Sequence, residues 1–167
     1  MKFTYYLSYN KTKEIRGITK MSEVKHLEIN YKTDELFEAF RAFGNKDLYM
    51  VEELQGQMID ASSDSPFYGI FHGENLVARM ALLKKGDVEE IYFPEFDDYL
   101  LLWKLEVLEK YQNKGYGQSL IDYAKSYNMP IKAIARQNSK NFLINQDFED
   151  VHAKNPEGHD VLVWSPK

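Results

Sequence analysis

The chain contains no cysteine among its 167 residues. This absence excludes disulfides, thiolate nucleophiles and cysteine-ligated zinc sites. The four histidines do not supply a metal site either, because their spacing matches no ligand motif such as H-E-x-x-H. We therefore expect no metal site.

The sequence also lacks a long apolar run and an excess of basic charge. No stretch approaches the ~20 apolar residues that a membrane-spanning helix needs, and the first residues lack the apolar core of a signal peptide. The formal net charge is -5, whereas nucleic-acid-binding domains usually carry a basic patch. We expect a cytoplasmic protein with neither a membrane nor a nucleic acid as partner.

The composition that is present is typical of one globular domain. Hydrophobic residues make up 44% of the chain and aromatic residues 14%, which suits a packed core at this length. Residues 1–20 have no clear hydrophobic period, whereas a regular pattern begins at Met21. We expect residues 1–20 to be a weakly ordered extension and residues 21–167 to form the domain.

The hydrophobic period predicts alternating strands and helices along this domain. Thr33 is the expected cap of the first helix, and Gly44 its expected end. The expected strands cover residues 24–31, 67–71, 76–83, 99–107, 131–135 and 161–164, and the expected helices cover 33–44, about 47–59, 117–127 and 139–145. This order is typical of an α+β or mixed α/β domain.

The stretch from Leu105 to Gly117 carries the clearest chemical signal. A buried strand ends at Val107, a short turn follows, and Gly115 and Gly117 stand where a helix should begin. The first turn of a helix offers unpaired N–H groups and the positive end of its dipole. Glycines let a phosphate approach that backbone closely. The segment is therefore suited to bind a pyrophosphate.

Two familiar phosphate motifs do not fit this turn. A dinucleotide fingerprint needs a third glycine where Leu120 stands, and no Walker sequence is present. The turn resembles motif A of the GNAT superfamily, [Q/R]-x-x-G-x-[G/A], with Gln112, Gly115 and Gly117 at its positions. Asn113 departs from that family, which often has glycine there, as does residue 109, a glutamate where proline is common.

A second segment supports the same resemblance. Ser139 to Phe148 is similar to motif B of the superfamily, with Phe142 at one of its hydrophobic positions. The W-K-L-E-V strand at 103–107 resembles a group of uncharacterised small GNAT proteins from Firmicutes. The resemblance covers roughly Val24 to Trp164. It implies the GNAT fold, a central, mostly antiparallel sheet flanked by helices.

The resemblance also implies an activity, the transfer of an acetyl group from acetyl-CoA to a primary amine by direct attack. The acceptor would be a small molecule or a peptide, and the protein a monomer or a homodimer. The residues implied to contact acetyl-CoA are Val107, Gln112, Asn113, Lys114, Gly115, Tyr116, Gly117 and Ser139. Two alternatives stay open: a GNAT-fold module that binds CoA without turnover, and an unrelated domain with an incidental glycine turn.

The catalytic residues are less well specified. Glu106 is the carboxylate nearest the expected acetyl site and is our candidate general base. It alternates with Leu105 and Val107, so it is expected on the other face of the strand. Exposure of this face, or an ion pair with Lys104 or Arg79, would also explain a charged residue at this position. At the motif B tyrosine position stands residue 143, a leucine, which cannot protonate a thiolate. Either another tyrosine acts, or the thiolate leaves unaided, or the chain does not catalyse.

Overall fold

The computed structural model describes residues 22–43, 50, 56, 64–85, 97–136 and 139–167. Its strands are β1 (Lys25–His26), β2 (Phe67–His72), β3 (Asn75–Lys84), β4 (Leu100–Val107), β5 (Ile131–Ile134), β6 (Glu149–Lys154) and β7 (Asp160–Trp164). Its helices are α1 (Tyr31–Phe43), the short 3-10 helix η2 (Glu109–Tyr111), α3 (Tyr116–Lys125) and α4 (Lys140–Asn145).

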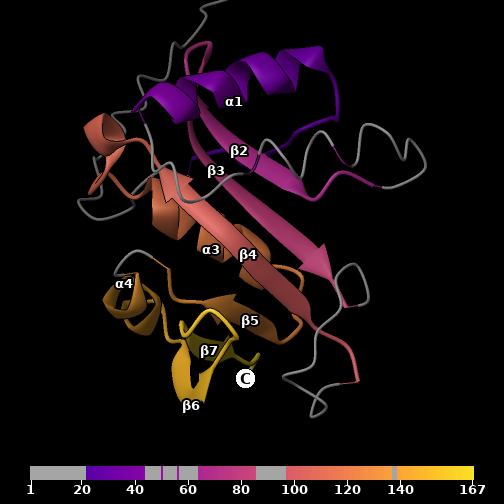
Figure 1. Cartoon of the computed structure of the whole chain (residues 1–167), viewed down its shortest axis with the longest axis vertical. Coiled ribbons are helices and arrows are strands. Elements are labelled where there is room, and N and C mark those ends of the chain that lie inside the picture. Colours follow the sequence, from indigo (N-terminus) through magenta and orange to yellow (C-terminus); the bar gives the residue numbers. More distant parts are fainter. Residues whose placement is uncertain (1–21, 44–49, 51–55, 57–63, 86–96, 137–138) are drawn as a thin grey trace, which may run out of the picture.

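The strands form one sheet in the order β1-β2-β3-β4-β5-β7-β6. Every neighbouring pair is antiparallel except β4 and β5, which run parallel. This arrangement confirms the expected mixed, mostly antiparallel sheet flanked by helices. Figure 1 shows α1 and α3 on opposite sides of the sheet.

Each face of the sheet is covered by its own apolar cluster. On one face, Leu120 and Ile121 of α3 pack with Met80 and Leu102 of the sheet. On the other face, residues of α1 pack with β2 and β3 in a second cluster. Because both faces are covered, β3 and β4 are almost continuously apolar rather than alternating.

The parallel ladder between β4 and β5 is shorter than β4 itself, so the two strands are paired over only part of their length. The β4–β5 ladder ends where Leu102 pairs with Ala133, whereas β4 continues to Val107. Across β4, Leu82 pairs with Leu102 and the preceding residue of β3 pairs with Lys104, so Trp103 is an extra residue in a bulge. Bulges bend a strand locally. The two strands therefore diverge at Trp103, and a fork opens between them.

Most of the predicted elements are confirmed, but two predictions at the N-terminal side are wrong. The strand expected over 24–31 is reduced to Lys25–His26, and α1 begins at Tyr31 rather than after Thr33. The reason is that the Thr33 amide donates to Asn30 Oδ1 at 3.0 Å. Asparagine caps helices as well as threonine does, so the cap lies three residues earlier.

One strand was not expected, and one predicted helix cannot be compared. β6 (Glu149–Lys154) has no apolar alternation because it is an edge strand with mostly exposed side chains. His152 has a φ of 57° within it, which also interrupts a regular pattern. Apart from residues 50 and 56, the helix expected over about 47–59 lies outside the described residues, as does most of the connection over 84–98.

Candidate functional site

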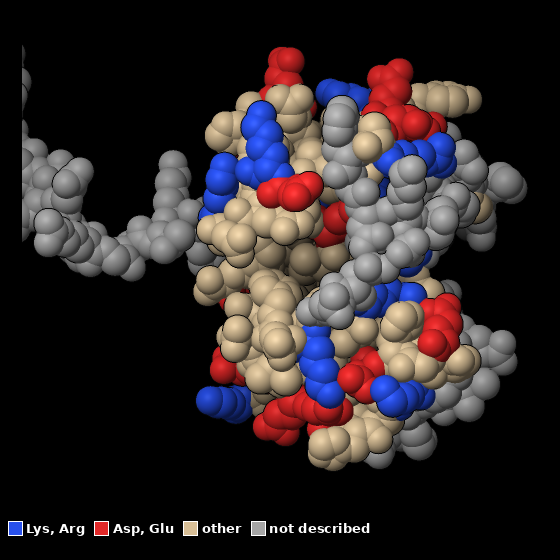
Figure 2. Space-filling model, turned by 60° about the vertical axis from the view of Figure 1, so that its left-hand side comes forward, with Lys and Arg blue, Asp and Glu red and all other residues tan. Residues whose placement is uncertain are grey.

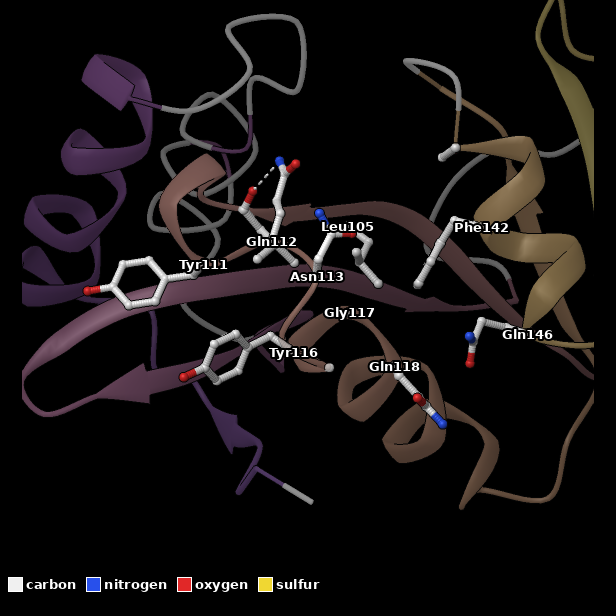
Figure 3. A pocket seen from close by; sticks show the side chains of 12 residues that line it. Leu105, Tyr111, Gln112, Asn113, Tyr116, Gly117, Gln118, Phe142 and Gln146 are labelled. Carbon is white, nitrogen blue, oxygen red and sulfur yellow. Dashed lines mark hydrogen bonds between the residues drawn. The ribbon is translucent and has the colours of Figure 1, made fainter. Parts of the chain in front are cut away.

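A cavity of about 530 Å³ lies between the end of β4, the loop that leads into α3, and α4. Its wall includes all but one of the residues predicted to bind the cofactor: Val107, Gln112, Asn113, Gly115, Tyr116, Gly117 and Ser139. The exception, Lys114, is on the same loop, with its Nζ 5.3 Å from the centroid of the Tyr111 ring. The structure thus brings the segment 107–117 and the distant Ser139 into one site. Figure 3 shows Gln112, Asn113, Tyr116 and Gly117 around this cavity.

Sequence reasoning missed five further residues of the wall: Leu105, Tyr111, Gln118, Phe142 and Gln146. Part of this set could have been found. Ser139, Phe142 and Gln146 are separated by three and four residues, a spacing that places side chains on one helical face. Since Ser139 was already a candidate, its helical neighbours were candidates too.

The loop before α3 presents backbone amides to the cavity. Asn113 and Gly115 have positive φ angles of 59° and 87°, and Gly115 is the N-cap of α3 without a side-chain cap. The Ser119 amide donates to the Gly115 carbonyl at 2.9 Å. The amides that come before Ser119 in the first turn have no acceptor within the helix. Successive amides in such a loop form a concave anion site, and the helix dipole reinforces it.

Gln112 closes this loop onto the strand. Its side-chain Nε2 donates to the Val107 carbonyl at 3.1 Å, and Figure 3 shows this bond as a dashed line. The bond ties the first residue of the loop to the last residue of β4. Gln112 therefore sets the curvature of the loop, which brings the amides and the end of β4 to the same cavity.

Gly117, in the first turn of α3, is part of the cavity wall. A Cβ atom added to Gly117 would lie 3.1 Å from Phe142 Cζ on α4 and 3.8 Å from Val107 Cγ2 on β4. Three elements therefore approach the same point in the first turn of α3. The absence of a side chain here keeps the loop amides accessible to a ligand in the cavity.

The edge of β4 supplies a second kind of binding surface. Leu105 and Val107 line the cavity, and in the described chain β4 has no ladder with β5 beyond Leu102. Strand edges of this kind present backbone N–H and C=O groups that can pair with amides of an extended ligand. The cavity therefore offers an anion site at one end and a strand edge along its wall.

Glu106 lies on the other side of β4 and is buried. Its Oε2 accepts hydrogen bonds from Arg79 Nη2 at 2.8 Å and from Arg79 Nε at 3.1 Å. The Arg79 guanidinium stacks on α1, 4.7 Å and 4.3 Å from the ring centroids of Phe37 and Phe40. The ion pair with Arg79 that the sequence left open is confirmed. The role of Glu106 as a base stays a prediction.

No tyrosine of the described wall replaces the missing motif B tyrosine. Leu143 is 3% exposed and packs in the core on the α3 face. Tyr111 and Tyr116 line the cavity, but Figure 3 shows their hydroxyl groups pointing away from Leu105 and Phe142. The described wall thus offers no phenol to the centre of the cavity.

A separate tyrosine cluster lies outside this wall, on α3 and β2. The Tyr127 hydroxyl lies 3.3 Å from that of Tyr68 and 3.4 Å from that of Tyr123. Burial, together with the hydrogen bond shared with Tyr127, raises the pKa of Tyr123 to about 12 and also raises the pKa of Tyr68. Both phenols therefore stay protonated at neutral pH.

Two further expectations concern metal ions and membranes. In the ranges that the structure describes, no group of three or more histidine, aspartate or glutamate side chains could hold a metal ion. The same ranges contain no helix long and apolar enough to cross a membrane. Figure 2 shows basic and acidic side chains interspersed on the face turned forward, without a field of one sign.

The chain belongs to the acetyltransferase (GNAT) family, whose model matches residues 30–137. It is 95% identical over 147 residues to an uncharacterized N-acetyltransferase of Staphylococcus haemolyticus, covering 88% of this chain and 100% of that protein. It is 77% identical over 146 residues to one of Staphylococcus aureus strain COL, covering 87% of this chain and 100% of that protein. It is thus an N-acetyltransferase of the GNAT class.

Solved structures agree with this assignment. The Bacillus subtilis N-acetyltransferase YlbP, crystallised in complex with coenzyme A, superposes with a TM-score of 0.67 at 46% identity, over 87% of this chain and 97% of that one. An acetyltransferase from Corynebacterium glutamicum superposes with a TM-score of 0.64 at 13% identity, over 88% of this chain and 97% of that one. The second likeness concerns the fold alone.

Proposed function

We propose that the chain uses acetyl-CoA to acetylate a primary amine of a small molecule or a peptide. The observation that carries this proposal is the union of an amide-lined loop and an open strand edge in one cavity. Acetyl-CoA has a matching pair of parts, a pyrophosphate and an extended pantetheine with two amides. The complex of the Bacillus subtilis relative with coenzyme A supports the same reading.

The fit can be described residue by residue. The amides of Gln112 to Gly117 would hold the pyrophosphate, because positive φ angles at Asn113 and Gly115 shape that loop. The exposed edge of β4 beside Leu105 and Val107 would pair with the pantetheine amides. Phe142 and Val107 supply apolar contact on either side of Gly117. Each feature matches a part of acetyl-CoA in the order in which that molecule would lie.

The reaction itself needs little covalent chemistry from the protein. The neutral amine attacks the thioester carbonyl carbon, so that a C–N bond forms and the C–S bond breaks. The amine loses one proton and the thiolate departs with its electron pair. The chain contributes mainly by holding the two reactants in line, a contribution that is large in enzymes generally. Leu143 provides no proton for the thiolate and no phenol of the described wall points toward it, so within the described site water or the acceptor's released proton would neutralise it.

A second candidate function is binding of CoA without turnover. The buried Leu143 at the motif B tyrosine position favours it, because the described wall then contains no phenol aimed at the leaving sulfur. The two functions differ in one measurement. Release of free CoA in the presence of an amine panel supports transfer, and tight binding without CoA release supports the binding module.

The first experiment is a calorimetric titration of acetyl-CoA into the full chain and into Gly117→Glu. Even a Cβ at residue 117 would lie 3.1 Å from Phe142 Cζ. The larger glutamate side chain would fill this space, and its carboxylate would repel the pyrophosphate. We expect micromolar affinity for the wild type and a loss of about a hundredfold or more for the variant.

The control is Asn141→Glu, which adds the same charge at an exposed position of α4 outside the described cavity wall. This variant should bind acetyl-CoA like the wild type. If the folded wild-type protein binds no acetyl-CoA, the proposed function is wrong.

A further inference from the structure

Two lysine ammonium groups converge on one side chain of the cavity wall. Lys110 Nζ lies 5.5 Å and Lys114 Nζ 5.3 Å from the centroid of the Tyr111 ring. Tyr111 lines the cavity that contains the loop amides. A local pair of positive charges thus lies beside a wall residue of the cavity that contains the proposed pyrophosphate site, in a chain whose net charge is -5.

These two lysines are available to a ligand, unlike the lysines near the α4 wall. Lys140 Nζ lies 2.5 Å from Asp150 Oδ2 and 2.9 Å from Asp160 Oδ2. Lys125 Nζ donates to the Gln146 carbonyl at 2.6 Å. By contrast, Lys110 and Lys114 make cation–π contacts but no ion pair with any described residue. Contact with an aromatic face leaves ammonium N–H donors for an anion.

The aromatic support of the two lysines is held in place from three sides. The Tyr111 amide donates to the Leu108 carbonyl at 2.7 Å, which fixes the end of η2. The rings of His72 and Tyr116 lie 5.6 Å and 6.2 Å from the Tyr111 ring, and the Tyr116 hydroxyl lies 3.4 Å from His72 Nδ1. The hairpin of β2 and β3 and the start of α3 therefore position Tyr111.

One carboxylate lies close in sequence and must be considered. Glu109 borders a second cavity, of about 540 Å³, next to α1, and does not line the cavity of the loop amides. Lys110 and Tyr111 border that second cavity as well. Tyr111 thus borders both cavities, and Lys110 and Lys114 both lie beside its ring. The described wall of the cavity that contains the loop amides therefore includes no carboxylate.

We propose that Lys110 and Lys114 form a subsite for the 3′-phosphate of CoA. This inference rests on the proposed function and deepens it. The loop amides suit the pyrophosphate without supplying a full charge, whereas a phosphomonoester carries about -1.5 to -2 charges at neutral pH. The ribose connects the two groups, so the 3′-phosphate must lie near the loop. Lysine ammonium groups are common phosphate ligands.

The test compares CoA with dephospho-CoA, which lacks only the 3′-phosphate. We expect the full chain to bind CoA about tenfold more tightly, the size expected from two exposed charge pairs. The ratio should fall toward one as the salt concentration rises, because exposed pairs are screened. Calorimetric titrations at two salt concentrations measure both effects.

The decisive variant is the double substitution Lys110→Gln and Lys114→Gln. It should lower the affinity for CoA about tenfold and change the affinity for dephospho-CoA by about twofold or less. The matched control is Lys32→Gln with Lys167→Gln, two exposed lysines that remove the same charge elsewhere. The control pair should keep the preference for CoA.

Each other outcome has a defined meaning. Equal binding of CoA and dephospho-CoA by the wild type overturns the subsite and leaves the proposed function intact. A preference for CoA that survives in the double variant also overturns it, as does an equal loss in the control pair. If neither ligand binds the folded wild type, the proposed function itself fails.

Discussion

Arg79 and Glu106 face each other directly across β3 and β4, and their side chains, 3% and 5% exposed, form a buried ion pair with an N–O distance of 2.8 Å. A charge taken out of water is costly unless its partner is present. Two aromatic rings of α1 cover the guanidinium, Phe37 and Phe40. The pair thus joins the strand that carries the cavity wall to the helix on the opposite face.

Substitution Glu106→Gln should destabilise the fold. Removing one partner of a buried pair costs about 3–5 kcal/mol, because the charge that stays buried loses the ion pair that offset its desolvation. Urea denaturation would measure this loss. The pH dependence of any acetyl transfer by the folded variant should match that of the wild type.

The double variant Arg79→Met with Glu106→Leu is the control, because replacing both charges by apolar groups removes the uncompensated charge. It should recover part of the lost stability. A stable Glu106→Gln protein whose kcat falls and whose pH profile loses its basic limb would instead establish Glu106 as the general base.

Substitution Gly115→Ala should weaken CoA binding. Gly115 has a φ of 87°, and a side chain in the left-handed region costs about 1–2 kcal/mol. Relaxation of that strain would displace the amides of the loop. Gly73→Ala is the matched control, because Gly73 has a φ of 64° in the hairpin turn and is absent from the described cavity wall. Calorimetry should show reduced affinity in Gly115→Ala only, and an equal reduction in both variants would contradict this prediction.

Stability should depend on pH through Asp160. Hydrogen bonds from Lys154 and Lys140 lower the pKa of Asp160 from 3.8 to about 2. A carboxylate whose pKa is lowered by folding stabilises the protein above its unfolded pKa, and this contribution is lost as the pH falls toward the folded value. The Asp160→Asn variant should therefore melt below the wild type at pH 6 and converge with it near pH 2. A difference in melting temperature that is equal at both pH values would refute the assignment.

Residues 1–20 should be dispensable for folding. The first described residue, Ser22, donates its amide to Ser119 Oγ on α3 at 3.3 Å, so the chain is already attached to the domain at the expected boundary. A chain that starts at Met21 should melt at the same temperature as the full chain in differential scanning calorimetry. Failure to fold, or a much lower melting temperature, would show that the N-terminal residues belong to the domain.

The glycine turn could be predicted because its requirements are local. Gly115 needs a positive φ and Gly117 needs the space of a missing side chain, and both demands are visible in a six-residue pattern. The first helix boundary was wrong for a local reason as well. Asn30 and Thr33 are both good caps, and only the hydrogen bond between them shows which one begins α1.

Other features depend on residues that are distant in sequence. The pairing of Arg79 with Glu106 requires the register of β3 against β4, which a single strand pattern does not specify. The same is true of Phe142, which reaches Gly117 across the cavity from another helix. β6 escaped prediction because an exposed edge strand has no buried face to impose alternation on its side chains.

The sequence by itself determined the fold class, the family resemblance and the glycine turn of residues 112–117, for which it predicts phosphate binding. These depend on hydrophobic period, glycine positions and helix polarity, all of which act over a few residues. Only the tertiary structure decided that β4 leaves β5 at Trp103, that Glu106 is buried with Arg79, and that two lysines meet at Tyr111. The physical reason is that strand register and side-chain burial result from packing of the whole chain, whereas a turn is specified by its own residues.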